Sequence, residues 1–396
     1  MNSQEIIRKT ERLGARNYSP KPVVISHGEG VFVCDPEGSE YIDMLSAYSA
    51  LNFGHRHPEL VAAAKAQLDR LTLTSRAFHN DLLCEFYEAL SLLTGKEKIL
   101  PMNTGAEAVE TALKTARRWG SDIKGIPDGQ QEIIVCANNF HGRTLGIISM
   151  STDESARRGF APHTPGFRVI PYGDAAALED AVTPQTAAFL AEPIQGEAGV
   201  IVPPEGWLRA VREICSKNNI LFLADEVQTG LARTGAMFAC HHEGVEPDIY
   251  ILGKALGGGI LPVSAIAANA SLLDVFEPGS HGSTFGGNPL SCAVAIKVIE
   301  ILQRDGYARQ AAEKGAYFIQ GLRNIQNPDI REIRGKGLLI GVEFHSNAAP
   351  YVKKLMAEGI LAKETHEKTI RFAPPIPITF AQLDSALAGI QTAFGA

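Results

Sequence analysis

The sequence predicts an α/β fold, with a large doubly wound, mostly parallel sheet followed by a smaller α+β unit. From about residue 100 onward, short apolar runs typical of buried strands alternate with amphipathic helical stretches. This alternation is typical of a parallel sheet covered by helices on both faces. The chain has 396 residues, of which 45% are hydrophobic, so it can bury a large core.

The individual elements follow from local patterns. Residues 30–44 (GVFVCDPEGSEYIDM) predict a hairpin with a DPEG turn, and residues 57–71 predict an amphipathic helix. The predicted strands of the large sheet are 132–138, 167–173, 187–193, 220–226 and 248–254, with helices at 206–218 and 288–305. Beyond these, residues 330–344 and 369–375 indicate strands of a smaller unit.

The change from alternating strands and helices to a smaller α+β pattern predicts a domain boundary near residue 305, where no linker sequence marks its position. We expect residues 49–305 to form the large domain and residues 306–396 a C-terminal small domain. Residues 1–48 are expected to contribute to the small domain and to the pocket.

Two neighbouring predicted strands end in charged residues. The run ILFLADE reaches Asp225 and Glu226, and the run DIYILGK delivers Lys254. Because open α/β sheets bind ligands at the carboxyl ends of their strands, these runs offer a carboxylate and an amine at one edge. The alternatives are that Asp225 caps the next element and that Lys254 lies on the surface, although LGKALGGG leaves little polar surface there.

Charge and composition exclude several classes of protein. The net charge of −7 is spread without a basic stripe, which predicts no nucleic-acid partner, and no apolar stretch is long enough to span a membrane. The first twenty residues lack the apolar core of a signal peptide. Six scattered cysteines without a CxxC pair predict a reduced, cytoplasmic setting. The histidines lack the spacing of metal ligands, so no metal is expected.

The glycine patterns exclude a Walker loop and a dinucleotide-binding loop, but they favour a phosphate site at the start of one helix. Gly253–Lys254 lacks the other residues of a Walker loop, and the glycines of 335–341 miss the dinucleotide fingerprint by one residue. By contrast, Thr104 and Glu107 form a capping box at the start of an amphipathic helix. Its first turn, Gly105–Ala106, can bring free backbone N–H groups to a phosphate.

Together these groups predict a pyridoxal phosphate site. A buried lysine amine such as Lys254 can be neutral and condense with an aldehyde to form a Schiff base. An ionised Asp225 can hold a pyridine nitrogen in its protonated state. With a phosphate site, these are the groups that a pyridoxal phosphate enzyme needs, and the ring serves as an electron sink.

Ordered motifs over nearly the whole chain carry a family resemblance. They are SAYSALNFGHRHP, NTGAEA, FHGRT, EPIQGEAGV, LADEVQTGLARTG, LGKALGGG, HGSTFGGNP, RGKGLLIG and RFAPP. In this order they resemble the class III (ω-amino acid) aminotransferases, which are pyridoxal phosphate enzymes of fold type I. NYSP, TSRAF, MNTG and EAG resemble the branch that acts on ornithine, which belongs to arginine and proline metabolism. Branches that act on acetylornithine or 4-aminobutyrate are the alternatives.

Carried over position by position, the resemblance implies the contacts to the cofactor ring. Lys254 would form the Schiff base and later move the proton between the substrate Cα and the cofactor. Asp225 would pair with the pyridinium nitrogen, Gln228 would lie near the phenolic oxygen, and Phe140 would stack on the ring face.

The resemblance also implies how the phosphate is held. Thr104, Gly105 and Ala106 would bind it within the same subunit, and Thr284 would reach the phosphate of the neighbouring subunit. The protein is therefore expected to be a homodimer or a higher homo-oligomer with shared active sites.

Substrate selection is expected to involve two arginines. The resemblance implies that Arg143 holds the α-carboxylate of ornithine and that Tyr18 contacts its α-amine. Arg371 would hold the carboxylate of 2-oxoglutarate near the ring. Glu197 would neutralise Arg371 during the first half-reaction and release it for the second, with Tyr48 supporting the pair. Without the resemblance, Glu197 would be taken for a solvated loop acid and Arg371 for a surface cation on an edge strand.

The resulting hypothesis is a transamination in two stages. Ornithine would lose its terminal amine to give glutamate 5-semialdehyde, which cyclises to pyrroline-5-carboxylate, and 2-oxoglutarate would leave as glutamate. Two other classes stay open at this point. A regulator that kept the fold without turnover would carry an added basic DNA-binding segment, and a dehydrogenase would bind a nicotinamide nucleotide tightly.

Overall fold

A seven-stranded sheet forms the centre of the large body. The computed structural model of the chain describes residues 1–395. The strands are β4 (Lys98–Met102), β5 (Glu132–Cys136), β6 (Phe167–Ile170), β7 (Thr186–Ala191), β8 (Leu221–Asp225), β9 (Ile249–Leu252) and β10 (Ser264–Ala268). Their order is β4-β10-β9-β8-β7-β5-β6; strands β9 to β6 pair in parallel, and β10 is antiparallel to both of its neighbours. The prediction of a mostly parallel α/β sheet is confirmed.

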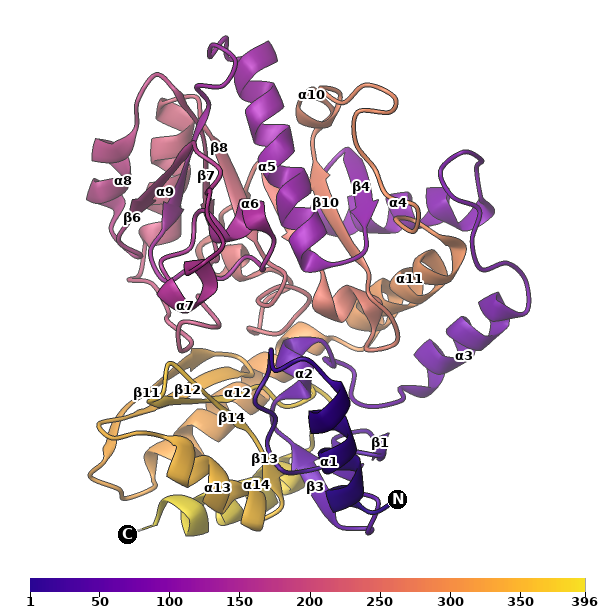
Figure 1. The fold of residues 1–396 in the computed structure, drawn as a ribbon, viewed down its shortest axis with the longest axis vertical. Coiled ribbons are helices and arrows are strands. Elements are labelled where there is room, and N and C mark those ends of the chain that lie inside the picture. The colour runs from indigo at the N-terminus through magenta and orange to yellow at the C-terminus, as the bar shows by residue number, and fades with distance from the viewer. Residues whose placement is uncertain (396) are drawn as a thin grey trace.

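Helices cover both faces of this sheet (Figure 1). The helices of the large body are α3 (Pro58–Leu68), α4 (Asp81–Thr94), α5 (Gly105–Asp122), α6 (Leu145–Ile148), α7 (Glu154–Arg157), α8 (Ala175–Ala181), α9 (Trp207–Lys217), α10 (Ala270–Leu273) and α11 (Pro289–Arg304). Successive residues of a strand point to opposite faces. In β8, Leu223 packs in the cluster that contains the apolar side of α5, whereas Phe222 packs with α8 and α9.

Two smaller sheets form the second body. One has the order β1-β2-β3-β13 and the other β11-β12-β15-β14. Their strands are β1 (His27–Glu29), β2 (Phe32–Cys34), β3 (Glu40–Asp43), β11 (Ile330–Lys336), β12 (Leu339–Phe344), β13 (Ile360–Leu361), β14 (Lys363–Thr365) and β15 (Thr369–Phe372). The accompanying helices are α1 (Ser3–Leu13), α2 (Ser46–Ser49), α12 (Tyr307–Arg323), α13 (Ala349–Ala357) and α14 (Phe380–Phe394).

The two ends of the chain meet in this second body. Strand β13 pairs in parallel with β3, with Ile360 opposite Ile42. Figure 1 shows the N-terminal elements, in indigo, beside the C-terminal elements, in yellow. This pairing supports our proposal that residues 1–48 and 306–396 form one small domain and 49–305 the large one.

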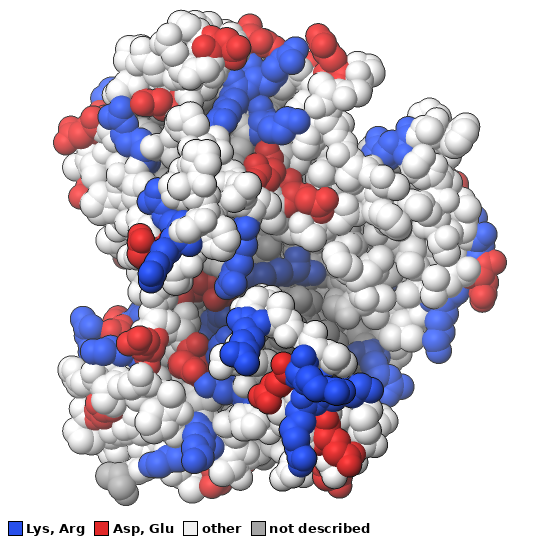
Figure 2. Space-filling model, viewed as in Figure 1, with Lys and Arg blue, Asp and Glu red and all other residues white. Residues whose placement is uncertain are grey.

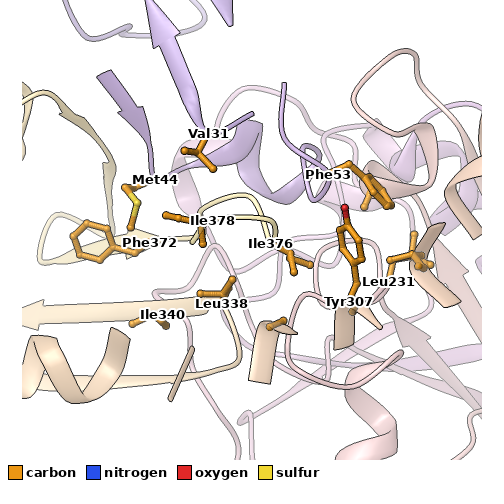
Figure 3. Close-up of a cluster of buried hydrophobic side chains, with 14 of the residues drawn as sticks. Val31, Met44, Phe53, Leu231, Tyr307, Leu338, Ile340, Phe372, Ile376 and Ile378 are labelled. Atoms are coloured by element: carbon orange, nitrogen blue, oxygen red, sulfur yellow. The ribbon is translucent and has the colours of Figure 1, made fainter. Parts of the chain in front are cut away.

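A buried apolar cluster joins the two bodies. Its side chains come from the N-terminal segment (Met44), from the large body (Phe53, Leu231) and from the C-terminal part (Tyr307, Phe372), as Figure 3 shows. Phe53 and Tyr307 pack with ring centroids 5.2 Å apart. Burying each such ring contributes about 2 kcal/mol to stability, so the cluster fixes the N-terminal segment against the other two parts.

Two further features follow from the described residues. No helix among residues 1–395 is both long and apolar enough to cross a membrane. All six cysteines are free thiols.

Candidate active site

Four neighbouring strands deliver functional side chains to one edge of the sheet. In sheet order, Lys254 follows β9, Asp225 ends β8, Glu192 follows β7 and His141 lies in the loop after β5. Asp225 is opposite Ile251 in the parallel pair β8–β9, three residues before Lys254. The acid and the amine therefore lie at the same edge of the sheet, as the sequence predicts. We call Lys254, Asp225, Glu192 and His141 the strand-end cluster.

Asp225 is oriented by a buried histidine. His141 Nδ1 lies 2.6 Å from Asp225 Oδ2, and both side chains are buried. Burial alone would lower the pKa of His141, but the hydrogen bond and charge of Asp225, with a smaller effect of Glu192, raise it above its ordinary value. The other oxygen of Asp225 accepts the backbone N–H of Val227 at 3.1 Å.

Glu192, for which the sequence predicted no role, connects two loops of the site. Its carboxylate accepts the N–H of Phe140 at 3.0 Å and that of Gly196 at 3.3 Å. Burial, with the charge of Asp225, raises the pKa of Glu192 to about 7 although His141 opposes the shift. The signal was present, because AAFLAEP is a third apolar run that ends in an acid.

Lys254 begins a short 3₁₀ turn and faces the cavity. Its φ of +43° is unusual for a residue with a side chain, and such strain is often found at functional sites. Burial lowers the pKa of Lys254, and Arg371 acts in the same direction, whereas Glu197 and Asp225 oppose the shift. A larger neutral fraction makes the amine a better nucleophile.

The N-terminus of α5 packs beside Lys254. A Cβ on Gly253 would lie 3.6 Å from Gly105 Cα, and a Cβ on Gly142 would lie 2.9 Å from Ala106 Cβ. The first turn of an 18-residue helix is thus close to both the lysine and the Phe140 loop. The hydroxyl of Thr104 accepts the N–H of Glu107, so it is engaged in the predicted capping box.

A large cavity opens above the strand-end cluster. It has a volume of about 1120 Å³, and Figure 2 shows the hollow between the two bodies with charged side chains along it. Of the predicted site residues, it is lined by Tyr18, Tyr48, Phe140, Arg143, Glu197, Lys254 and Arg371. Asp225 and Gln228 lie buried behind this wall. Thr284 is exposed and outside the cavity, consistent with its predicted role toward a neighbouring subunit.

Glu197 and Arg371, which we call the gate pair, form an ion pair in the cavity wall. Arg371 Nη1 lies 2.6 Å from Glu197 Oε1, and only 2% of the Arg371 side chain is exposed. Arg371 is not on an edge strand, because β15 lies between β12 and β14. Burial would raise the pKa of Glu197, but the charges of Arg371 and Lys254 hold it below its ordinary value. Gln228 contacts both partners, at 3.1 Å and 3.3 Å.

Tyr48 is presented to the gate pair by a strained turn. Residues 46–49 all have positive φ, a left-handed run that costs about 1–2 kcal/mol per residue. The buried carboxylate of Asp43 accepts the N–H of Ser46 at 2.8 Å and contacts His55 at 2.8 Å, which holds the turn. The Tyr48 ring then lies 5.1 Å from Arg371 Cζ.

Arg143 lies near the exposed mouth of the cavity. Its guanidinium is 5.6 Å from the ring of Tyr18 and 5.7 Å from the ring of Phe140. The three side chains therefore form one aromatic–cation group, in which both rings are substantially exposed. Within residues 1–395, no group of three or more His, Cys, Asp or Glu side chains is arranged to hold a metal ion.

This fold and site define a transaminase that depends on pyridoxal phosphate. The chain belongs to the class-III aminotransferases, whose family model matches residues 13–394. An ornithine aminotransferase of Geobacillus sp. (strain WCH70) is 59% identical over 390 residues, covering 98% of each chain.

Two solved structures bear on the cofactor and on the branch of the family. An ornithine aminotransferase from Toxoplasma gondii, described with partial occupancy of PLP at its active site, is 44% identical with a TM-score of 0.98, covering 99% of this chain and 94% of that one. An acetylornithine aminotransferase from Elizabethkingia anophelis is 47% identical with a TM-score of 0.91, covering 100% and 99%.

The residues at the edge of the sheet fit pyridoxal 5'-phosphate. Lys254, an amine with a lowered pKa, lines the cavity, the carboxylate of Asp225 lies behind the wall in contact with His141, and the start of α5 packs beside Lys254. His141 Nε2 and Arg371 Nε are buried without a hydrogen-bond partner, so both nitrogens are available to form hydrogen bonds with a bound group. When bound, the cofactor supplies an electron sink for the carbanion formed at the substrate carbon.

Proposed function

We propose that this chain is an ornithine δ-aminotransferase that transfers the terminal amine of L-ornithine to 2-oxoglutarate. The observation that carries the proposal is the gate pair, because Arg371, a cation of the cavity that also contains Lys254, is neutralised by the loop acid Glu197. The high identity to an ornithine aminotransferase over 98% of both chains supports the same substrate. The products are glutamate and glutamate 5-semialdehyde, which cyclises to pyrroline-5-carboxylate.

The strand-end cluster supplies the chemistry around the cofactor. Lys254 Nζ is its covalent attachment point and then moves the proton at the substrate carbon that carries the transferred amine. Asp225 holds the proton on the pyridine nitrogen, and His141 keeps that carboxylate in place. Phe140 would cover the face of the bound ring, and Gln228, which accepts a hydrogen bond from Arg371, would lie near its phenolic oxygen.

Backbone groups and a second subunit complete the cofactor site in this proposal. The N–H groups of Gly105 and Ala106, after the Thr104 cap, bind the phosphate with the favourable end of the α5 dipole. Thr284 contacts the phosphate of the neighbouring subunit, which is supported by its exposure away from its own cavity. The assembly is a homodimer or larger, and the free cysteines support a cytoplasmic setting.

The gate pair explains how one pocket serves two different substrates. Ornithine reacts at its terminal amine, so its α-carboxylate lies at the far end, where Arg143 binds it and Tyr18 contacts the α-amine. Glu197 meanwhile neutralises Arg371, and ordinary α-amino acids find no cation beside the ring. When 2-oxoglutarate enters, Glu197 withdraws and Arg371 binds the carboxylate next to the reacting carbonyl.

Two measurements test the proposal. Borohydride reduction of the purified enzyme, followed by peptide mapping, should fix the cofactor at Lys254. Single-turnover half-reactions with ornithine, N-acetylornithine and 4-aminobutyrate should then show the highest kcat/KM for ornithine. The competing function is that of the acetylornithine branch, which the 47% identity to an acetylornithine aminotransferase favours. A preference for the acetylated amine would establish that function instead.

A further inference from the structure

Lys363 is a cation of the cavity wall that has no role in the site as described so far. The cations that line the cavity are Arg143, Lys254, Lys363 and Arg371, and the acids are Asp153, Glu197 and Glu364. Glu364 is already paired with Lys21 at 2.5 Å. Among residues 1–395, no carboxylate lies within salt-bridge distance of Lys363, so its charge faces the cavity uncompensated.

Lys363 is placed beside the gate pair by strand pairing. In the antiparallel pair β14–β15, Lys363 is directly opposite Arg371, and opposite residues project from the same face of a sheet. Lys363 Nζ donates to Tyr48 Oη at 3.1 Å and lies 5.6 Å from the centre of that ring. Arg371 approaches the same ring at 5.1 Å. The two cations therefore share one aromatic neighbour.

Two like charges opposite each other across a strand pair repel, so the arrangement favours an anion between them. Ornithine brings no anion to this end of the pocket, since its carboxylate lies near Arg143. A 2-oxo acid does, because its carboxylate adjoins the reacting carbonyl. Lys363 is half-buried, whereas Arg371 is 2% exposed and occupied by Glu197. Lys363 is thus the cation that an incoming carboxylate meets while the gate pair is still closed.

We propose that Lys363 determines specificity in the oxo-acid half-reaction by binding, together with Arg371, the carboxylate next to the reacting carbonyl of the 2-oxo acid. The inference rests on the proposed function and extends it to a residue for which the sequence predicts no role. Lys363 acts as a point charge, while Arg371 supplies the bidentate fork that fixes orientation. Tyr48 keeps the ammonium at this end of the cavity until the substrate arrives.

The test uses Lys363→Met in the holoenzyme, which keeps an apolar stem on the Tyr48 ring and removes the charge. We expect the apparent Kd for 2-oxoglutarate in the single-turnover half-reaction to rise about tenfold, as for the loss of one charge-assisted hydrogen bond. The ornithine half-reaction should change far less. Calorimetric titration with glutarate, an unreactive dicarboxylate, should show the same weakening of binding without depending on turnover.

Two control variants separate binding from a merely structural role. Tyr48→Phe removes the hydrogen bond to Lys363 but keeps the ring and the charge, so it should affect oxo-acid binding less than Lys363→Met does. Lys354→Met removes an exposed lysine that also lies over a tyrosine ring, at 5.7 Å, outside the cavity, and should change neither half-reaction.

The inference is overturned if Lys363→Met affects both half-reactions equally, if it leaves glutarate binding unchanged, or if Tyr48→Phe reproduces its full effect. These outcomes are distinct from a failure of the proposed function. That failure would appear in the unmodified enzyme, as a missing cofactor at Lys254 or a missing ornithine half-reaction.

Discussion

The strand-end cluster and the gate pair are two parts of one site, but the chain builds them differently. Asp225 and Lys254 are held by adjacent parallel strands whose every residue is buried. Glu197 lies in a loop, Arg371 comes from β15 of the small body, and Tyr48 comes from a strained turn near the N-terminus. A sheet core defines the geometry of the first part, whereas the second part is assembled from separate segments, and under the proposed function it is the part that rearranges.

This difference suits the two tasks. The cofactor stays in place through both half-reactions, so the groups around it benefit from being rigid. The substrates alternate between a diamine with one carboxylate and a dicarboxylate, so the groups that bind them must change partners. Buried ion pairs are costly to dehydrate and are weak evidence for stability. Under the proposed function, the Glu197–Arg371 pair serves an exchange of partners and not primarily the stability of the fold.

The largest expected effect lies in the rigid part. Asp225→Asn removes the charge that holds the ring nitrogen protonated, and we expect kcat/KM to fall on the order of 10²–10³-fold for both substrates. Glu226→Gln alters the next residue, an equally buried acid bonded to Thr229 and Cys240 instead, and should leave the turnover of folded enzyme nearly unchanged. Comparable losses in both variants would mean that burial of an acid, and not its contact with the cofactor, matters here.

An intermediate effect should appear in the movable part, and it should be unequal between substrates. Glu197→Ala leaves Arg371 without its acid, so the half-reaction with glutamate should speed up, shifting the glutamate-to-ornithine ratio by about tenfold. Glu364→Ala, which removes a cavity acid paired with Lys21, serves as the control and should leave the ratio unchanged. Equal losses with both amino acids would show that Glu197 does not act as a gate.

The smallest effect concerns stability and follows from the His141–Asp225 pair. The pKa of His141 is raised in the folded protein, so its stabilising effect is present below the unfolded value of about 6.5 and is lost as pH rises through the folded value. Urea unfolding should show that His141→Gln destabilises the protein by about 1–3 kcal/mol near pH 6. The difference should shrink toward pH 9, and a destabilisation that grows with pH would contradict this assignment.

Most of the rigid part could be predicted from local patterns. Mostly apolar runs identified strands β5 to β9, of which the edge strand β6 is only partly buried, and the ends of β8 and β9 identified Asp225 and Lys254. The same signal, an acid after an apolar run, pointed to Glu192 but was not used. Strands β4 and β10 were missed because KILPM contains a proline and SAIAA consists mostly of small residues, so neither has the apolar run or strict alternation of a typical strand.

Prediction was weaker where contacts join distant segments. Lys363 is 315 residues from Tyr48, and no local pattern indicates that their side chains meet. The left-handed turn at residues 46–49 was also unexpected, because Ser, Ala and Tyr have no preference for positive φ. Tertiary contacts such as the carboxylate of Asp43 enforce it.

The sequence by itself determined the doubly wound sheet, the strand ends that carry Asp225 and Lys254, and, through ordered motifs, the family. These features follow from the spacing of apolar residues and from the residues that end each strand, which are local patterns of a few residues. Only the tertiary structure decided that His141 orients Asp225, that Arg371 is buried rather than on an edge strand, and that Lys363 lies beside it. These three arrangements bring together charged side chains from distant segments in a space with little water. There, the free energy of each charge depends on the groups that surround it in the fold and not on its neighbours in the sequence.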